Sequence, residues 1–182
     1  MLKYDLKPGD IIGFSGKGIV SDLINLGTYG IPRWSISHVA IIAEDYGRKY
    51  LFEASESDNS NGVCRYEPED VINRYSGRVW VYPLYRHLYW YESARLICDL
   101  MRVVNRPYDS KGAIKSAGFF YPAIRSLFHG PDFVKLFCSE LVASKFSEIG
   151  IYPTTNASRW NPNNYIRRLR QNGIVCKPKR LK

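Results

Sequence analysis

The sequence predicts a single α+β domain, because most of its strand-like segments precede residue 86 and its longer amphipathic helical segments follow it. The chain has 182 residues, of which 45% are hydrophobic and 24% are charged. A chain of this length and composition is typical of one globular domain with a sizeable core. Since no internal repeat, low-complexity tract or linker divides it, we expect the domain to comprise residues 1–182.

The first segments combine a turn, a strand and a helix. Residues 7–14, KPGDIIGF, have the pattern of a Pro-Gly turn that leads into a short buried strand. Apolar residues within 15–30 recur at near-helical spacing, which predicts a helix that ends at Gly27 or Gly30. This helical segment begins with SGKG but lacks the full P-loop pattern, so no phosphate-binding loop is expected.

Residues 37–55 are predicted to form two strands joined by a tight turn at Asp45-Tyr46-Gly47. With the register centred on that turn, His38 and Glu53 lie nearly opposite one another on neighbouring strands. Cross-strand partners have Cβ atoms roughly 4.5–5.5 Å apart, so these two side chains can meet.

The middle of the chain contains further strands and a longer helix. Residues 63–77 resemble a strand end and a short helix that opens at Pro68, and residues 78–85 resemble a strand that Pro83 closes. Between Tyr89 and Asn105 apolar residues recur at helical spacing, which predicts an amphipathic helix. Its expected inward stripe comprises Trp90, Ala94, Ile97, Cys98, Met101 and Val104. Cys98 is therefore expected in the core.

The last part of the chain contains two predicted helices. One begins near Cys138 and ends at Gly150, and Cys138 lies at its amino-terminal end, on its inward face. That face also carries Leu141, Val142, Phe146 and Ile149. The other helix has Asn161 as its N-cap, Pro162 as its first residue and Gly173 as its stop. A short strand, IVC, and a basic tail at 174–182 complete the chain.

The formal net charge is +9, and its distribution bears on the partners of the protein. Residues 161–182 contain seven basic side chains and no acidic one, whereas the rest of the chain has 19 basic and 17 acidic residues. The body is therefore nearly neutral. The basic tail could contact an anionic surface or polymer, such as lipid headgroups or a cell-wall polymer, or it could simply be solvated. No specific nucleic-acid site is predicted.

The cysteines and the apolar segments bear on metal binding and location. Cys64, Cys98, Cys138 and Cys176 form no CxxC pair and no Cys/His cluster at metal-ligand spacing, so no metal site is expected. The first ten residues lack the apolar core of roughly 7–15 residues that a secretory signal needs. The longest apolar segment, 116–128, is shorter than the ~20 residues of a membrane span. We therefore expect no transmembrane segment and a cytoplasmic location with reduced thiols, with release by another route such as cell lysis left open.

Cys138 raises the question of chemistry. A thiol at the start of a helix experiences the positive end of the helix dipole, which favours the reactive thiolate. A nucleophilic cysteine also needs a base and a group that orients the base, and His38 with Glu53 could supply both. His87 and His129 are rival bases, but neither has a carboxylate of this kind near it in the sequence. The alternative is that Cys138 and His38 are ordinary core residues.

Five short motifs carry a resemblance to a known family. KPGDIIGF, SHVAII, YLFEAS, RPYDSKG and LFCSELVASKF occur in this order over about residues 7–150. The set resembles the circularly permuted papain-like hydrolases of the NlpC superfamily, the YiiX/YaeF type, in which the order His, acidic residue, Cys replaces the order of papain. The fold that the resemblance implies is a small antiparallel barrel-like sheet with helices packed on one side.

The resemblance also implies roles for individual residues. Cys138 would be the nucleophile, His38 the general base and Glu53 the carboxylate that orients the base. Tyr108 and Asp109 match a family motif and are assigned to substrate binding, or to a turn that supports the site. No metal or organic cofactor is implied.

The implied activity is that of a thiol-dependent peptidase or amidase, which cleaves a peptide or isopeptide amide, for example in a cell-wall peptide, through a thioester. The aromatic segment between Gly112 and Pro131 departs from the shorter members of the family and leaves the substrate open. A lipid acyl hydrolase or acyltransferase on the same fold is one alternative. A non-catalytic module that binds an anionic polymer through its basic tail is another.

Overall fold

The computed structural model describes residues 4–16, 36–57, 60–105, 132–154, 157, 160 and 162–182, with the backbone alone for 55–57, 60–61 and 132–137. Within these residues six strands form one antiparallel sheet in the order β4-β3-β2-β1-β5-β6. The strands are β1 (Ile11–Ser15), β2 (His38–Asp45), β3 (Arg48–Ser57), β4 (Ser60–Tyr66), β5 (Arg78–Tyr82) and β6 (Lys179–Arg180). The helices of the same ranges are α2 (Pro68–Arg74), α3 (Trp90–Met101), α6 (Asp132–Glu148) and α7 (Pro162–Gln171). The predicted α+β class is confirmed.

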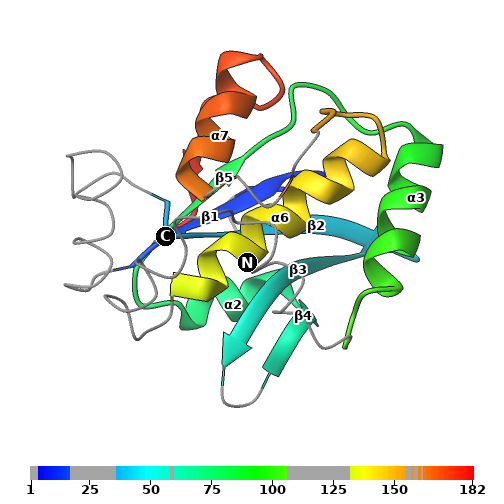
Figure 1. The fold of residues 1–182 in the computed structure, drawn as a ribbon. Helices are drawn as coiled ribbons and strands as arrows, with labels where there is room; N and C mark the ends of the chain where they lie inside the picture. The colour runs from blue at the N-terminus through cyan, green and yellow to red at the C-terminus, as the bar shows by residue number, and fades with distance from the viewer. Residues whose placement is uncertain are drawn as a thin grey trace, which may run out of the picture.

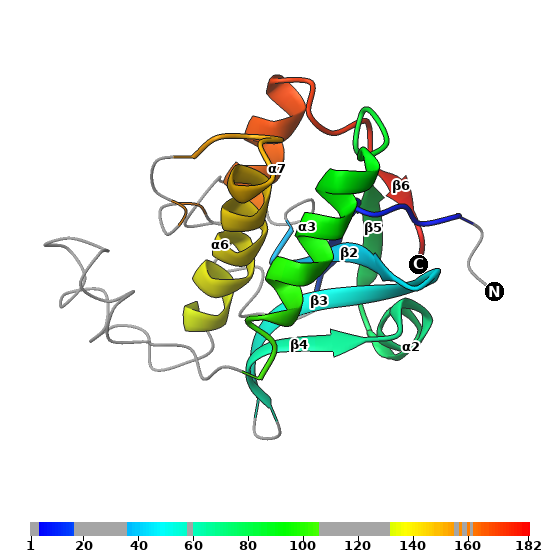
Figure 2. The same cartoon turned by 90° about the vertical axis from the view of Figure 1, so that its right-hand side faces the viewer.

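Both faces of the sheet are covered, because its central strands are apolar on both sides. In β2, Val39 and Ile41 belong to a core shared with α3, α6 and α7, whereas Ala40 and Ile42 belong to a second core that includes Ile72 of α2. Figure 1 shows α6 lying across one face with α7 and α3 on either side, and Figure 2 shows α2 on the opposite side of the sheet. The expectation that all helices pack on one side is therefore wrong.

The strand order is linear. β4 and β6 lie at its two ends, and no pairing between them closes the described part of the sheet. The expected barrel-like closure is not confirmed.

Local signals in the sequence correctly place the β2–β3 turn and the glycines that end α6 and α7. The β2–β3 hairpin has a two-residue turn at Tyr46 and Gly47, with φ values of 46° and 77°, as a tight hairpin turn requires. α6 ends at Gly150, whose φ of 76° accompanies the paired hydrogen bonds Ile151 N–H to Phe146 O and Gly150 N–H to Ser147 O of a Schellman motif. α7 ends in the same way at Gly173. The helix expected within 15–30 falls outside the described residues beyond Gly16.

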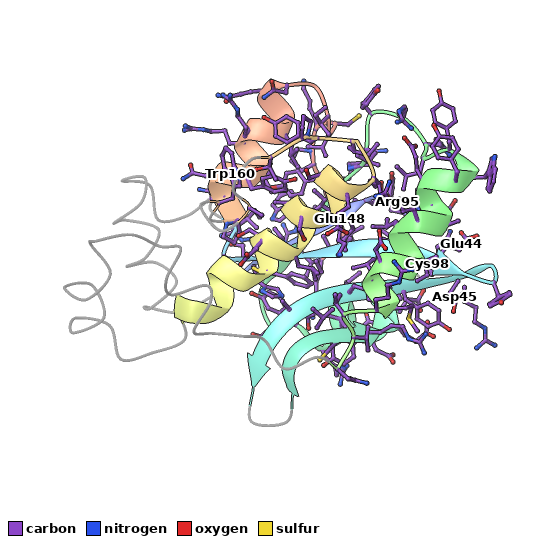
Figure 3. All side chains as sticks on the ribbon, turned by 45° about the vertical axis from the view of Figure 1, so that its right-hand side comes forward. Glu44, Asp45, Arg95, Cys98, Glu148 and Trp160 are labelled. Atoms are coloured by element: carbon purple, nitrogen blue, oxygen red, sulfur yellow. The ribbon has the colours of Figure 1, made fainter. Side chains whose placement is uncertain are left out.

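The helix α3 is predicted correctly, but its inward face only in part. Its buried residues are Glu92, Leu96 and Leu100. Of the expected stripe, Ile97 and Val104 are partly buried against the core, whereas Trp90 and Met101 are 83% and 41% exposed and Cys98 is exposed rather than in the core (Figure 3). The expected stripe is thus rotated away from the face that carries Leu96, Leu100 and the charged Glu92. Its carboxylate is satisfied by two hydrogen bonds of 2.7 Å from the guanidinium of Arg86.

The C-terminal residues 174–182 are part of the sheet rather than a free basic tail. The expected strand IVC is reduced to a single bridge between Val175 and Leu84. Further on, β6 pairs with β5, and Lys182 Nζ donates to the carbonyl oxygens of Asn73 and Tyr75 at 2.8 and 2.5 Å. The basic side chains of this segment therefore project from a structured edge of the domain.

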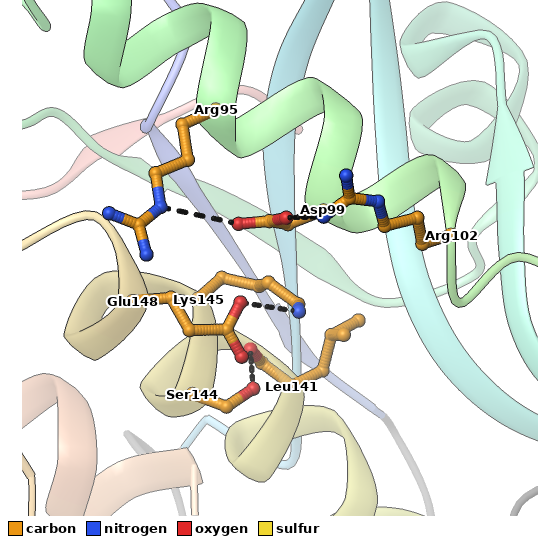
Figure 4. A network of polar contacts seen from close by, with 7 residues as sticks. All are labelled: Arg95, Asp99, Arg102, Leu141, Ser144, Lys145 and Glu148. Atoms are coloured by element: carbon orange, nitrogen blue, oxygen red, sulfur yellow. Dashed lines mark hydrogen bonds and ion pairs between the residues drawn. The ribbon is translucent and has the colours of Figure 1, made fainter.

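Charged residues of α3 and α6 lie close to each other along the seam between the two helices (Figure 4). On α3, Asp99 forms an ion pair with Arg95 at 3.6 Å and accepts a hydrogen bond from Arg102 at 3.0 Å. On α6, Lys145 is 6% exposed and donates to Glu148 at 2.7 Å. Asp99 and Lys145 thus each have a partner of opposite charge on their own helix, which offsets much of the cost of removing them from water. Of the helices in the described ranges, none is long and apolar enough to span a membrane.

Asp10 joins the turn before β1 to the residues after β5. Its carboxylate is 1% exposed and accepts the N–H groups of Lys7 at 2.9 Å and of Leu84 at 3.2 Å. Burial raises the pKa of this carboxyl to about 6, although the two hydrogen bonds oppose the shift. The buried charge above pH 6 is thus tolerated because backbone donors surround it.

We predict that Asp10→Asn flattens the pH dependence of stability between about pH 4 and 6. The folded pKa of Asp10 lies above the unfolded one, so the folded state binds the proton more tightly in this window. The free energy of unfolding of the wild-type chain should therefore fall as pH rises through it, by on the order of 2–3 kcal/mol. Urea unfolding at several pH values measures the difference between the two proteins.

The matched control is Asp5→Asn. Asp5 is exposed, and its hydrogen bonds with Lys49 and Lys7 lower its pKa to about 2, so its contribution changes only below the window. A wild-type slope that persists in Asp10→Asn would contradict the assignment.

Candidate active site

His38 and Glu53 meet across the β2–β3 hairpin. One pair beyond Ile41 and Phe52 in the register, Glu53 lies opposite Ala40, so it is diagonally across from His38 on the same face of the sheet. His38 Nε2 lies 2.7 Å from Glu53 Oε2, and the two side chains are 19% and 15% exposed. The sequence-based expectation that these side chains meet is confirmed, with a diagonal rather than a directly opposite register.

Cys138 completes a hydrogen-bonded chain from the other side of His38. It lies on α6, which packs against β2 and β3, and it is fully buried. Its thiol is hydrogen-bonded to the imidazole of His38. The structure therefore brings together all three residues of the predicted triad.

The electrostatics of this chain favour a charged imidazole. Burial by itself lowers the pKa of His38, but the charge and hydrogen bond of Cys138, followed by those of Glu53, outweigh it and raise the pKa to about 10. An imidazolium held between two potential anions is the arrangement that stabilises a thiolate. The site can therefore hold a reactive sulfur close to a group that gives and takes protons.

The position of Cys138 in its helix differs from the expected one. α6 begins at Asp132, so Cys138 lies in the second turn rather than at the amino-terminal end. The unpaired N–H groups and most of the dipole effect belong to the first turn of a helix. The expectation that the start of the helix activates the thiol is thus wrong, and its backbone N–H is not free to serve an oxyanion. His38 and Glu53 are the groups that act on it.

The rival and additional residues fall elsewhere. His87 is exposed in the connection between β5 and α3, where its charge acts on Asp10. His129, Tyr108 and Asp109 lie outside the described residues, as does the aromatic segment 112–131. Of the histidines that the structure describes, only His38 contacts a cysteine and a carboxylate.

Three residues that the sequence did not single out surround the His38–Glu53 pair. Phe14, the β1 partner of His38, has its ring centroid 5.5 Å from the imidazole. Tyr75 follows α2 and packs edge-on against Phe14, with centroids 4.9 Å apart. Its hydroxyl is hydrogen-bonded to Ser37, while burial and, to a lesser extent, the charge of Glu53 raise its pKa. The pairing of β1 with β2 could have indicated Phe14, but no local pattern connects Tyr75 to this site.

Comparison with known proteins bears on the fold. No family model matches the sequence, and no curated protein matches it. Among solved structures, the fold is similar to that of the metalloprotein yiiX from Escherichia coli O157:H7, with a TM-score of 0.57 and 17% sequence identity, over 96% of this chain and 88% of the other. The similarity is one of fold, and it agrees with the YiiX/YaeF type that the sequence motifs resemble.

We predict that the pKa of His38 falls by at least one unit in Cys138→Ala and in Glu53→Gln, because each change removes a group that stabilises the imidazolium. NMR titration of the imidazole resonances of the wild-type chain should give a value near 10, well above the ordinary 6.5. Cys98→Ala, which removes an exposed thiol on α3, should leave the titration unchanged. A wild-type His38 that titrates near 6.5 would contradict the predicted charge distribution.

Proposed function

We propose that this protein is a cysteine hydrolase that cleaves an amide bond through a thioester intermediate. The observation that supports the proposal is the continuous hydrogen-bonded chain from Cys138 through His38 to Glu53. A nucleophile, a base and a group that orients the base are the three parts that such a mechanism needs, in this order.

In the proposed reaction His38 holds the proton of the Cys138 thiol, and the thiolate attacks the carbonyl carbon of the amide. A C–S bond forms, and the imidazolium then donates its proton to the leaving nitrogen as the C–N bond breaks. Water attacks the resulting thioester with His38 as its base, which releases the acid and restores the thiol. Glu53 orients the imidazole ring through its hydrogen bond with Nε2.

The substrate class is proposed to be a peptide or isopeptide amide, such as a cell-wall peptide, as the resemblance to the NlpC superfamily implies. The lipid acyl alternative depends on the aromatic segment 116–128, which lies outside the described residues. No described feature around Cys138 favours an acyl lipid, so the amide is the first candidate.

A metal-dependent function is suggested by the name of the Escherichia coli protein. Within the described part of the chain, no group of three or more His, Cys, Asp or Glu side chains could hold a metal ion. His38 is hydrogen-bonded to Glu53 and to Cys138, so these three side chains satisfy one another. The donors do not fit a metal, and no metal step is proposed.

The test is turnover of peptidoglycan peptides and of acyl lipids by the purified chain. Cys138→Ala and His38→Ala should each lower kcat roughly 10³-fold or more, and Glu53→Gln should lower it less. Turnover is preferred to thiol labelling because Cys138 is fully buried, so a small electrophile would report access as well as reactivity.

The matched controls are Cys98→Ala and His87→Ala, which remove an exposed thiol and an exposed imidazole outside the site and should retain full turnover. Turnover at the wild-type rate in Cys138→Ala would contradict the proposal. Binding of a wall polymer with no turnover of either substrate by the wild-type chain would instead identify a non-catalytic binding module.

A further inference from the structure

A group of exposed aromatic side chains lies far from the candidate active site. Among the described residues six large hydrophobic side chains are exposed, and four of these are clustered between residues 85 and 91. They are Tyr85, Tyr89, Trp90 and Tyr91, referred to here as the aromatic surface. Single exposed apolar residues are ordinary, whereas a contiguous group of this kind marks an interaction surface.

The aromatic surface is held in a fixed arrangement. The Tyr89 and Tyr91 rings are nearly parallel with centroids 5.6 Å apart, and Trp90 meets Tyr91 edge-on at 6.0 Å. The guanidinium of Arg86 lies 4.7 Å from the centre of the Tyr89 ring and is itself held by the buried carboxylate of Glu92. That carboxylate also accepts the Tyr89 N–H at 2.8 Å. The rings are therefore held in place by stacking on one another and by Arg86 and Glu92, although they are exposed.

Two exposed basic residues from the C-terminal part of the chain lie at the end of β5 that leads into this surface. Tyr85 N–H donates to Ile174 O at 3.0 Å and Cys176 N–H to Pro83 O at 2.8 Å, so the exposed Lys177 lies about level with Tyr82. Arg170, exposed in the last turn of α7, is close enough to β5 for its charge to act on Tyr82. Residues 161–182 contain no acidic side chain, and of the two carboxylates bonded to this part of the chain, Glu92 is neutralised by Arg86 and Asp10 is buried with backbone donors around it.

Tyrosine and tryptophan have an apolar body and a polar edge, and they prefer the boundary between lipid and water. Lysine and arginine near an anionic bilayer each add attraction to its headgroups. We propose that the aromatic surface, together with Arg170 and Lys177, is a docking site for an anionic membrane surface. The contact is peripheral, and it is independent of the proposed hydrolase activity.

The strand register shows how docking would orient the molecule. Tyr82, just before the aromatic surface, pairs with Ile11 at the start of β1, whereas His38 pairs with Phe14 near its end. The aromatic surface and the Cys138–His38–Glu53 chain therefore lie toward opposite ends of the central strands. A docked molecule would hold its candidate active site away from the bilayer, which suits a water-soluble amide near a membrane better than a lipid acyl chain.

The proposal is tested by cosedimentation of the full chain with vesicles of phosphatidylglycerol and phosphatidylcholine, and with vesicles of phosphatidylcholine alone. The wild-type chain should bind the anionic vesicles, and binding should weaken as salt is raised. Trp90→Ser with Tyr91→Ser should reduce the partition coefficient at least tenfold. Arg170→Gln and Lys177→Gln should each reduce it about fivefold.

Met101→Ser is the matched control, because Met101 is an exposed apolar side chain at the opposite end of α3 from Trp90, and it should bind as the wild type does. Thermal unfolding of each variant checks that the fold is retained. Failure of the wild-type chain to bind anionic vesicles would overturn the proposal. Equal loss of binding in Met101→Ser, or binding that depends on the basic residues but not on Trp90 and Tyr91, would overturn it as well.

Discussion

Burial of α6 against β2 and β3 joins two parts of the chain that are distant in the sequence, and the candidate active site exists only because of this packing. Val142 and Phe146 are fully buried on the same face of α6 as Cys138. Burying an apolar side chain of this size contributes about 1.5–3 kcal/mol relative to leaving it exposed. The burial of this hydrophobic face thus holds the sulfur of Cys138 next to the imidazole of His38. The contact of the thiol with the imidazole would not by itself hold the helix there.

Each polar group at the candidate active site has another of these groups as its hydrogen-bond or charge partner. Removing a carboxylate or an imidazolium from water is costly unless each finds a partner of opposite charge. Glu53 and Cys138 both support the charge on His38, and Tyr75, Ser37 and Phe14 enclose the pair. The same logic holds at Asp10, which is surrounded by backbone donors, and at Glu92, which Arg86 neutralises. At each of these three places the buried charge is therefore paired with an opposite charge or with backbone donors, and at His38 the pairing has the form of a candidate reactive site.

The two ends of the central strands carry different side chains. The half-buried His38–Glu53 pair lies at one end, and the exposed aromatic rings with nearby basic side chains lie at the other. The C-terminal segment connects these features to the fold, because its pairing with β5 and its bridge to Leu84 hold basic residues at a defined edge. A docking surface at one end leaves the other end open to water, so the proposed reaction and the proposed docking do not compete for space.

The sequence by itself determined the α+β class, the strands before residue 86, the β2–β3 turn and the helix stops at Gly150 and Gly173. It also indicated the pairing of His38 with Glu53, because a tight hairpin sets the register of its two strands over a few residues. Only the tertiary structure decided that α6 begins at Asp132, that α3 turns Glu92 rather than Cys98 inward, and that residues 179–180 form an edge strand. It also brought Tyr75 to the site. Turns and helix ends depend on hydrogen bonds between near neighbours, whereas the orientation of a helix and the covering of a sheet edge depend on the packing of distant residues.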